Sequence, residues 1–111
     1  SLDVKPTSCK YDSSFTPIVR VERGSGEADL QELKLIFLVG EDNIIRETKS
    51  NVPAQLESRT YSELEALPSA PTSVRVAGLV KTESGSEKLC DANVIVVPCK
   101  AEAVEATEEE S

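Results

Sequence analysis

The stretch Leu33-Lys-Leu-Ile-Phe-Leu-Val39 decides the fold, because its last five residues are apolar without interruption. A short apolar run with branched and aromatic side chains is typical of a β-strand that lies centrally in a sheet or is buried on both faces. Phe37 is therefore expected to fill the centre of the core. Exposure of this run would instead indicate a surface that binds a partner.

The rest of the chain predicts further strands, separated by turns rich in Gly, Pro, Asn and Ser. The clearest alternation, in which every second residue shares a face, runs over residues 73–82. Pro6 is expected to end the first strand and Pro98 the last. Together with the central run, seven segments are expected to form strands: residues 2–5, 16–23, 33–39, 44–48, 54–64, 73–82 and 89–97.

Short strands without a crossover helix between them predict an all-β fold, an antiparallel immunoglobulin-like β-sandwich of about seven strands. The chain has 111 residues, which is enough for one such core. We expect the sandwich to occupy residues 1–100. Residues 101–111 contain five Glu and one Val, so they are expected to form an acidic disordered tail or, alternatively, a linker to a following segment.

Charge and composition exclude several classes of function. The formal net charge is −8, and an acidic surface repels phosphate backbones, so no nucleic-acid partner is expected. The chain contains no histidine, which removes Ser-His-Asp and Cys-His catalysis and His-based zinc sites. We therefore expect no enzyme, no catalytic residues, no cofactor and no metal site.

The remaining candidates for chemistry are acidic and serine residues in turns and in the tail. Solvated surface and turn geometry explain them, and an enzyme built from carboxylates and lysines is the least favoured function. The Asp residues lack the spacing of a calcium loop, although separate loops of a sandwich could assemble a calcium site. These candidates are Glu41, Asp42, Glu63, Glu65, the three Glu residues 108–110, Ser25, Ser84, Ser86, Asp3, Asp12, Asp29 and Asp91.

The three cysteines, Cys9, Cys90 and Cys99, lack metal-ligand spacing and predict one disulfide and one free thiol. On a continuous strand Cys90 and Cys99 would lie about 30 Å apart, whereas a disulfide needs Cα atoms within about 7 Å. Cys9 therefore pairs with one of them. The first strand of such sandwiches often runs parallel to the last, which favours Cys9–Cys99 and leaves Cys90 as a small buried residue on the inner face.

Two alternatives to that pairing stay open. Cys9 can pair with Cys90 if the first and last strands are placed differently. All three cysteines can also be reduced thiols buried in a cytosolic protein. A disulfide favours an extracellular or cell-surface location, because such bonds persist in oxidising compartments.

The block Ile18-Val-Arg-Val-Glu-Arg-Gly-Ser-Gly-Glu-Ala-Asp-Leu-Gln-Glu-Leu-Lys-Leu-Ile-Phe37 resembles a pattern of archaeal type IV pilin-like proteins. In that pattern an apolar strand leads into R-G-S-G-E, a small polar link and a second apolar strand. The segments Leu56-Glu-Ser-Arg-Thr-Tyr-Ser62, Val74-Arg-Val-Ala77 and Glu83-Ser-Gly85 resemble the strands and turn that follow. The resemblance spans about residues 16–90. Leu64-x-x-Leu67-Pro68 is similar to fibronectin type III domains and supports a sandwich only.

The pilin resemblance implies a β-rich head domain that follows a prepilin signal and a long hydrophobic helix. In that family the helices pack into a filament or anchor the protein in the membrane, and this chain lacks that helix. The function expected from it is a non-catalytic extracellular structural and interaction domain, the head of a pilin-like surface protein. The alternative is an immunoglobulin-like adhesion or carbohydrate-binding module of a larger secreted protein. Expected partners are proteins or further copies at the cell surface, with membrane contact only through the missing helix.

Overall fold

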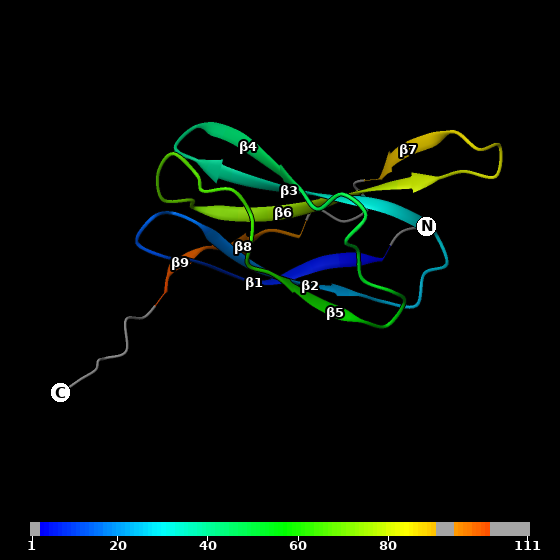
Figure 1. The fold of residues 1–111 in the computed structure, drawn as a ribbon, viewed down its shortest axis with the longest axis horizontal. Helices are drawn as coiled ribbons and strands as arrows, with labels where there is room; N and C mark the ends of the chain where they lie inside the picture. The colour runs from blue at the N-terminus through cyan, green and yellow to red at the C-terminus, as the bar shows by residue number, and fades with distance from the viewer. Residues whose placement is uncertain (1–2, 91–94, 103–111) are drawn as a thin grey trace.

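The structure is a computed structural model that describes residues 3–90 and 95–102. Within these ranges the regular elements are all strands, and they form the two layers of a sandwich (Figure 1). The predicted all-β fold is confirmed. The described strands are β1 (Val4–Tyr11), β2 (Pro17–Arg23), β3 (Asp29–Val39), β4 (Asp42–Glu47), β5 (Ser58–Tyr61), β6 (Ser73–Lys81), β7 (Glu87–Cys90), β8 (Val97–Pro98) and β9 (Lys100–Ala101).

The strands alternate between the two sheets in the manner of immunoglobulin-like sandwiches. The first sheet has the order β5-β2-β1-β9, and the second has the order β4-β3-β6-β7, with β8 also paired to β6. Neighbouring strands are antiparallel, except that β1 and β9 run parallel. The first strand therefore lies beside the last, as the sequence predicts. The β6–β7 hairpin projects at one end of the molecule (Figure 1).

Strand β3 lies between β4 and β6, so the apolar run is central in its sheet as predicted. From Leu33 to Val39 the odd-numbered side chains face the first sheet, and Leu33, Leu35 and Phe37 are completely buried. Phe37 is among the largest of the fully buried side chains and belongs to the hydrophobic core. Its even-numbered neighbours, Ile36 and Leu38, lie on the opposite face and are only half-buried. The run is thus buried on one face only.

The prediction that Pro6 ends the first strand is wrong. Strand β1 continues to Tyr11, and the register shifts between Pro6 and Ser8, so a β-bulge accommodates the proline. The bulge also changes which side chains face inward. Val4 and Pro6 are buried before it, and Cys9 is buried after it, because the extra residue reverses the alternation.

The strand predicted over residues 54–64 is shorter, because β5 covers only Ser58–Tyr61. The residues before it form a turn in which the Glu57 amide donates to the Ala54 carbonyl at 3.0 Å. Leu56 in this turn has φ of 62° and is 77% exposed. A left-handed residue cannot continue an extended strand, so β5 begins after it.

The last predicted strand, residues 89–97, is described only in part. β7 ends at Cys90, and residues 91–94 lie outside the described residues. The chain then pairs with β6 as β8, which includes Pro98, and with β1 as β9. Cys90 lies opposite Gly78 on the inner side of β6 and is half-buried, so it is less enclosed than the sequence predicts.

The described chain extends one residue past β9. Ala101 pairs with Tyr11, and the Glu102 amide donates to the Tyr11 carbonyl at 2.7 Å. Of the acidic tail predicted for residues 101–111, residues 103–111 lie outside the described residues.

Replacing Phe37 with Ala is expected to lower the free energy of unfolding by about 3–5 kcal/mol, because it removes a large buried side chain and leaves a cavity. Leu38→Ala, on the outer face of the same strand, is the matched control and is expected to cost less than about half as much. Urea unfolding followed by circular dichroism measures both. Equal losses for the two variants would contradict the one-sided burial of β3.

Candidate functional site

The predicted Cys9–Cys99 disulfide is present, with the two Cα atoms 4.5 Å apart. Cys9 is buried on the inner face of β1. Cys99 lies between β8 and β9, where the chain crosses from the second sheet to the first, and its amide donates to the Thr72 carbonyl at 2.9 Å. The bond therefore fixes the end of the described chain to its first strand. Cys90 is the free thiol, as predicted.

Removing this bond with Cys9→Ala and Cys99→Ala together is expected to lower the free energy of unfolding by about 2–5 kcal/mol, since the bond closes a long loop. Urea unfolding measures the loss, and Cys90→Ala is the matched cysteine control, with a smaller expected effect. Non-reducing peptide mapping of the unmodified chain should recover the Cys9–Cys99 peptide pair. Recovery of a Cys9–Cys90 pair would contradict the placement of β9 beside β1.

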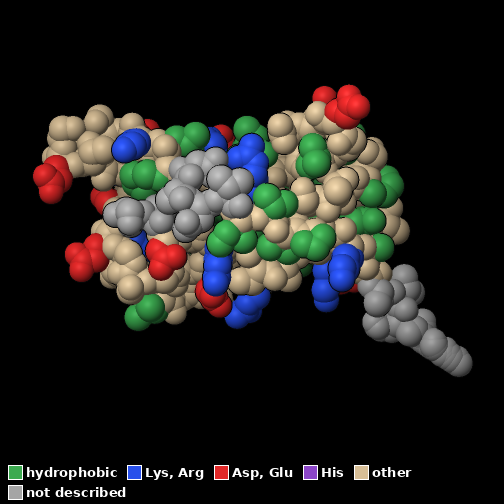
Figure 2. All heavy atoms as spheres, turned by 180° about the vertical axis from the view of Figure 1, so that it is seen from behind, with side chains coloured by type: hydrophobic (Ala, Val, Ile, Leu, Met, Phe, Trp, Pro, Cys, Tyr) green, Lys and Arg blue, Asp and Glu red, His purple; other side chains and the backbone are tan. Residues whose placement is uncertain are grey.

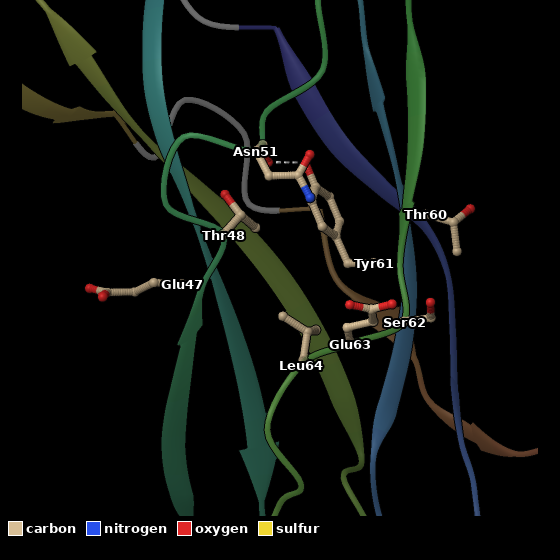
Figure 3. A pocket seen from close by; sticks show the side chains of 8 residues that line it. All are labelled: Glu47, Thr48, Asn51, Thr60, Tyr61, Ser62, Glu63 and Leu64. Carbon is tan, nitrogen blue, oxygen red and sulfur yellow. Dashed lines mark hydrogen bonds between the residues drawn. The ribbon is translucent and has the colours of Figure 1, made fainter.

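The second candidate is a polar hollow of about 370 Å³ between the edge strands β4 and β5. Figure 3 shows the Tyr61 ring lying between the two strands with its hydroxyl toward Asn51, whereas the Glu47 and Thr60 side chains point away from the ring. The hollow therefore opens at the side of the sandwich where the two sheets end. Its lining residues are Glu47, Thr48, Asn51, Thr60, Tyr61, Ser62, Glu63 and Leu64.

The hydroxyl groups at this hollow form internal hydrogen bonds. The Tyr61 hydroxyl donates to the Asn51 carbonyl at 2.8 Å, and burial raises the pKa of Tyr61 to about 12. The Thr48 hydroxyl accepts the Leu33 amide at 3.0 Å, next to the Thr48 amide that donates to the Leu33 carbonyl. Both hydroxyls thus hold the connection between β4 and β5 in place, and the raised pKa keeps the tyrosine protonated at neutral pH.

The Glu47 carboxylate at the rim is held by two ammonium groups. Lys34 on β3 and Lys49 after β4 both donate to it. The hydrogen bond from Lys34 and then that from Lys49 lower the pKa of Glu47 to about 2, from an ordinary value of 4.5. The same contact raises the pKa of Lys34. Glu47 is therefore ionised and paired over the whole physiological range.

This pairing predicts a pH dependence of stability. Because the folded pKa of Glu47 is lowered, the stabilisation is complete above pH 4.5 and is lost as the pH falls toward 2. Glu47→Gln should therefore be less stable than the unmodified chain at neutral pH by a modest amount, since the pair is exposed. Urea midpoints at a series of pH values should show the difference shrinking between pH 4.5 and 2.

The matched control for this titration is Glu41→Gln, at an exposed position in the turn between β3 and β4. Its difference from the unmodified chain should stay small at every pH. A Glu47→Gln difference that does not change with pH would show that the contacts with Lys34 and Lys49 do not stabilise the fold.

Within the described ranges, the acidic and serine residues singled out from the sequence lie in several separate turns and loops. Among the residues described, no group of three or more metal-ligating side chains occurs. The hydroxyls of Ser84 and Ser86 bond to each other and to Thr82 within the β6–β7 turn. The Asp12 carboxylate accepts two amides of its own turn, from Ser14 and Thr16. Asp91 and the Glu residues 108–110 lie outside the described residues.

The third candidate is the outer face of the second sheet, away from the core. Ile36 on β3 lies directly opposite Ile45 on β4, and Leu38 lies one row further along. Ile45 is 48% exposed, and Ile36 and Leu38 are half-buried. We call these three residues the outer apolar strip. The unbroken apolar run in the sequence gave the signal for this surface, since a strand with one solvated face normally alternates with polar residues.

The outer apolar strip ends at the edge strand β4. The Thr48 amide bonds to the Leu33 carbonyl, and alternate residues of an antiparallel strand direct their backbone groups to the same side. The backbone groups of Asn43, Ile45 and Glu47 therefore point away from β3. A second hollow of about 400 Å³, lined in part by Ile45 and Glu47, lies beside this edge. Space is thus left open next to the outward backbone groups.

A further exposed apolar segment precedes β8, where Ile95 and Val96 are 40% and 50% exposed. The side of the molecule in Figure 2 carries hydrophobic side chains mixed with Lys and Arg side chains, and acidic side chains show toward both ends. Residues 91–94 border this segment and lie outside the described residues. We therefore base the candidate surface on β3 and β4, which are described throughout.

Comparison with known protein families, curated proteins and solved structures finds no match to this chain. In the described ranges no helix is long and apolar enough to span a bilayer. The features of the described chain that bear on its function are the disulfide, the polar hollow and the outer apolar strip.

Proposed function

We propose that this chain is a non-catalytic structural and interaction domain of an extracellular or cell-surface protein. The observation that carries the proposal is the outer apolar strip, which leads to the open edge of β4. The polar hollow supports the non-catalytic part of the proposal. Its Tyr61 and Thr48 hydroxyls and its Glu47 carboxylate already have partners within the fold. A surface of apolar side chains beside unpaired backbone groups is suited to binding protein.

The disulfide supports a location outside the cytoplasm. Cys9 and Cys99 are joined across the crossing between the sheets, and such structural bonds persist in oxidising compartments. Loss of the bond would release the connection between β1 and β9. Within the proposal, the bond keeps the fold closed in the oxidising environment outside the cytoplasm.

The finer identity that we propose is the head domain of an archaeal type IV pilin-like protein. This identity is supported by the resemblance of residues 18–37, from β2 to β3, to the pattern of that family. In the fold, this block connects the two sheets. The buried Arg23 side chain donates to the carbonyls of Pro53, Gly26 and Ala28. It thereby ties the link between the two sheets to the loop that precedes β5. Arg23 followed by a short Gly-containing link is thus suited to carrying the chain from one sheet to the other.

The test is the location and redox state of the natural full-length protein in cells of the organism that encodes it. Intact cells are treated with trypsin, and surface material is removed by shearing and viewed by electron microscopy. We expect trypsin to digest the domain on intact cells, the sheared fraction to contain it, and a maleimide probe to label Cys90 but not Cys9 or Cys99. A ribosomal protein serves as the internal control for lysis.

Protection from trypsin together with maleimide labelling of all three cysteines would overturn the proposed location. If the protein is at the surface but neither filaments nor a membrane-anchored form is found, the interaction-domain proposal stands and the pilin-like identity is contradicted. In that case the full-length protein would fit the adhesion or carbohydrate-binding module better.

A further inference from the structure

We propose that the chain pairs with a second copy of itself through the open edge of β4, joining the two second sheets into one continuous sheet. The inference rests on the proposed function only in treating the chain as an interaction domain. It goes further by naming the partner, the strand and the register.

The edge strand β4 carries backbone groups without partners among the described strands. Asn43, Ile45 and Glu47 direct their backbone N–H and C=O groups away from β3. Among the described residues, the hydrogen bond that reaches these groups comes from the Arg46 guanidinium to the Ile45 carbonyl at 3.2 Å. β4 contains no proline or lysine, and its charged residues are Asp42 and Glu47 at its two ends and Arg46 on its inner side. A hollow of about 400 Å³ lies beside β4, between this strand and the loop residues Glu63, Leu64 and Glu65.

The loop after β5 is bound to the inner side of β4. The Arg46 side chain donates to the Glu65 carbonyl at 3.0 Å and to the Ala66 carbonyl at 2.7 Å. This contact fixes the loop after β5 on the inner side of the strand, with Arg46 itself opposite the buried Leu35. The loop lines the hollow, and in the described part of the chain no hydrogen bond joins it to the outward backbone groups of β4.

The charges on and beside β4 select the register of this pair. In a two-fold antiparallel pair, residues that share a face lie opposite each other, so the residue numbers of every pair have one constant even sum. With Ile45 opposite its own copy, Asn43 lies opposite Glu47, and Ile44 lies opposite Arg46. No like charges then face each other, and the Asn43 amide can donate to the Glu47 carboxylate.

The neighbouring registers are unfavourable. A shift of two residues in one direction places Glu41 opposite Glu47 of the other copy. A shift in the other direction places Arg46 opposite its own copy. Like charges directly opposite each other destabilise a strand pair, so the register centred on Ile45 is preferred.

The preferred register also completes the outer apolar strip. Ile36 lies opposite Ile45 within each copy. The two Ile45 side chains then meet at the centre, so four isoleucines form one row across the joined sheets. This row covers the exposed part of Ile45 and satisfies the outward backbone groups at the same time, which offsets part of the repulsion between two chains of net charge −8.

The register is tested by cross-linking in a Cys90→Ser background, which removes the free thiol. Ile45→Cys should form a covalent dimer under mild oxidation or with a short bis-maleimide, because the two side chains face each other. An Asn43→Cys chain mixed with a Glu47→Cys chain should yield the mixed dimer in excess over either symmetric dimer. Leu89→Cys is the matched control, since Leu89 is 52% exposed on the opposite edge strand, and it should cross-link far less.

Association of the chain without added cysteines is measured by sedimentation equilibrium over a range of concentrations. Ile45→Lys places two lysines face to face and should raise the dimer dissociation constant at least about tenfold, whereas Leu89→Lys should leave it within about twofold. Circular dichroism of each variant confirms that it is folded, since both positions are half-exposed.

A chain that sediments as a monomer at millimolar concentration would overturn this inference, as would equal cross-linking at Ile45→Cys and Leu89→Cys. Neither result would change the expected surface location of the natural protein. Conversely, if β4 pairs but the natural protein is found in the cytoplasm, this inference stands and the proposed function is overturned.

Discussion

The burial of one face of β3 is the constraint on which the rest of the structure depends. Leu33, Leu35 and Phe37 point between the sheets and are fully buried, so the first sheet must cover them and β4 and β6 must flank them. Moving this strand by one residue would exchange Phe37 for Ile36 or Leu38 in the core. The same alternation places Ile36 and Leu38 on the outside. Core and candidate surface are therefore two faces of one strand.

Polar and covalent contacts hold the rest of the sandwich against this core. The Cys9–Cys99 bond fixes the crossing near the end of the described chain, and the Tyr61 hydroxyl fixes the connection between β4 and β5. Arg23 does the same for the link between β2 and β3. Each contact lies where the chain passes between the sheets. These groups stabilise the fold. The Tyr61 hydroxyl and the Glu47 carboxylate of the polar hollow are already hydrogen-bonded within the protein and are not free to bind a ligand.

The parts of the fold that depend on local pattern could be predicted from the sequence. The apolar run of β3 and the alternation of β6 predicted the two central strands of the second sheet. The expected directions of the first and last strands favoured a Cys9–Cys99 disulfide over Cys9–Cys90. The bulge after Pro6 could not be predicted, since a proline normally ends strand pairing. Yet this bulge turns Cys9 inward. The disulfide was therefore predicted correctly from strand directions, while the local geometry that permits it was missed.

The candidate sites were harder to predict, for two physical reasons. Thr48, Asn51 and Tyr61 meet only because β4 and β5 end at the same side of the sandwich, and no spacing in the sequence encodes that meeting. The open edge of β4 depends on the order of strands in the sheet, which a single sequence does not specify. By contrast, the outer apolar strip had a visible signal in the unbroken run that contains Ile36.

The most direct test of this account is residue-resolved amide hydrogen exchange along β4, which is measured by NMR at low and at high protein concentration. We expect the amides of Ile44 and Arg46, which face β3, to be protected at both concentrations. The amides of Asn43, Ile45 and Glu47 should exchange freely in dilute solution and become protected as the chains associate. Equal protection of all five amides at every concentration would contradict the account, because β4 would then have no open edge.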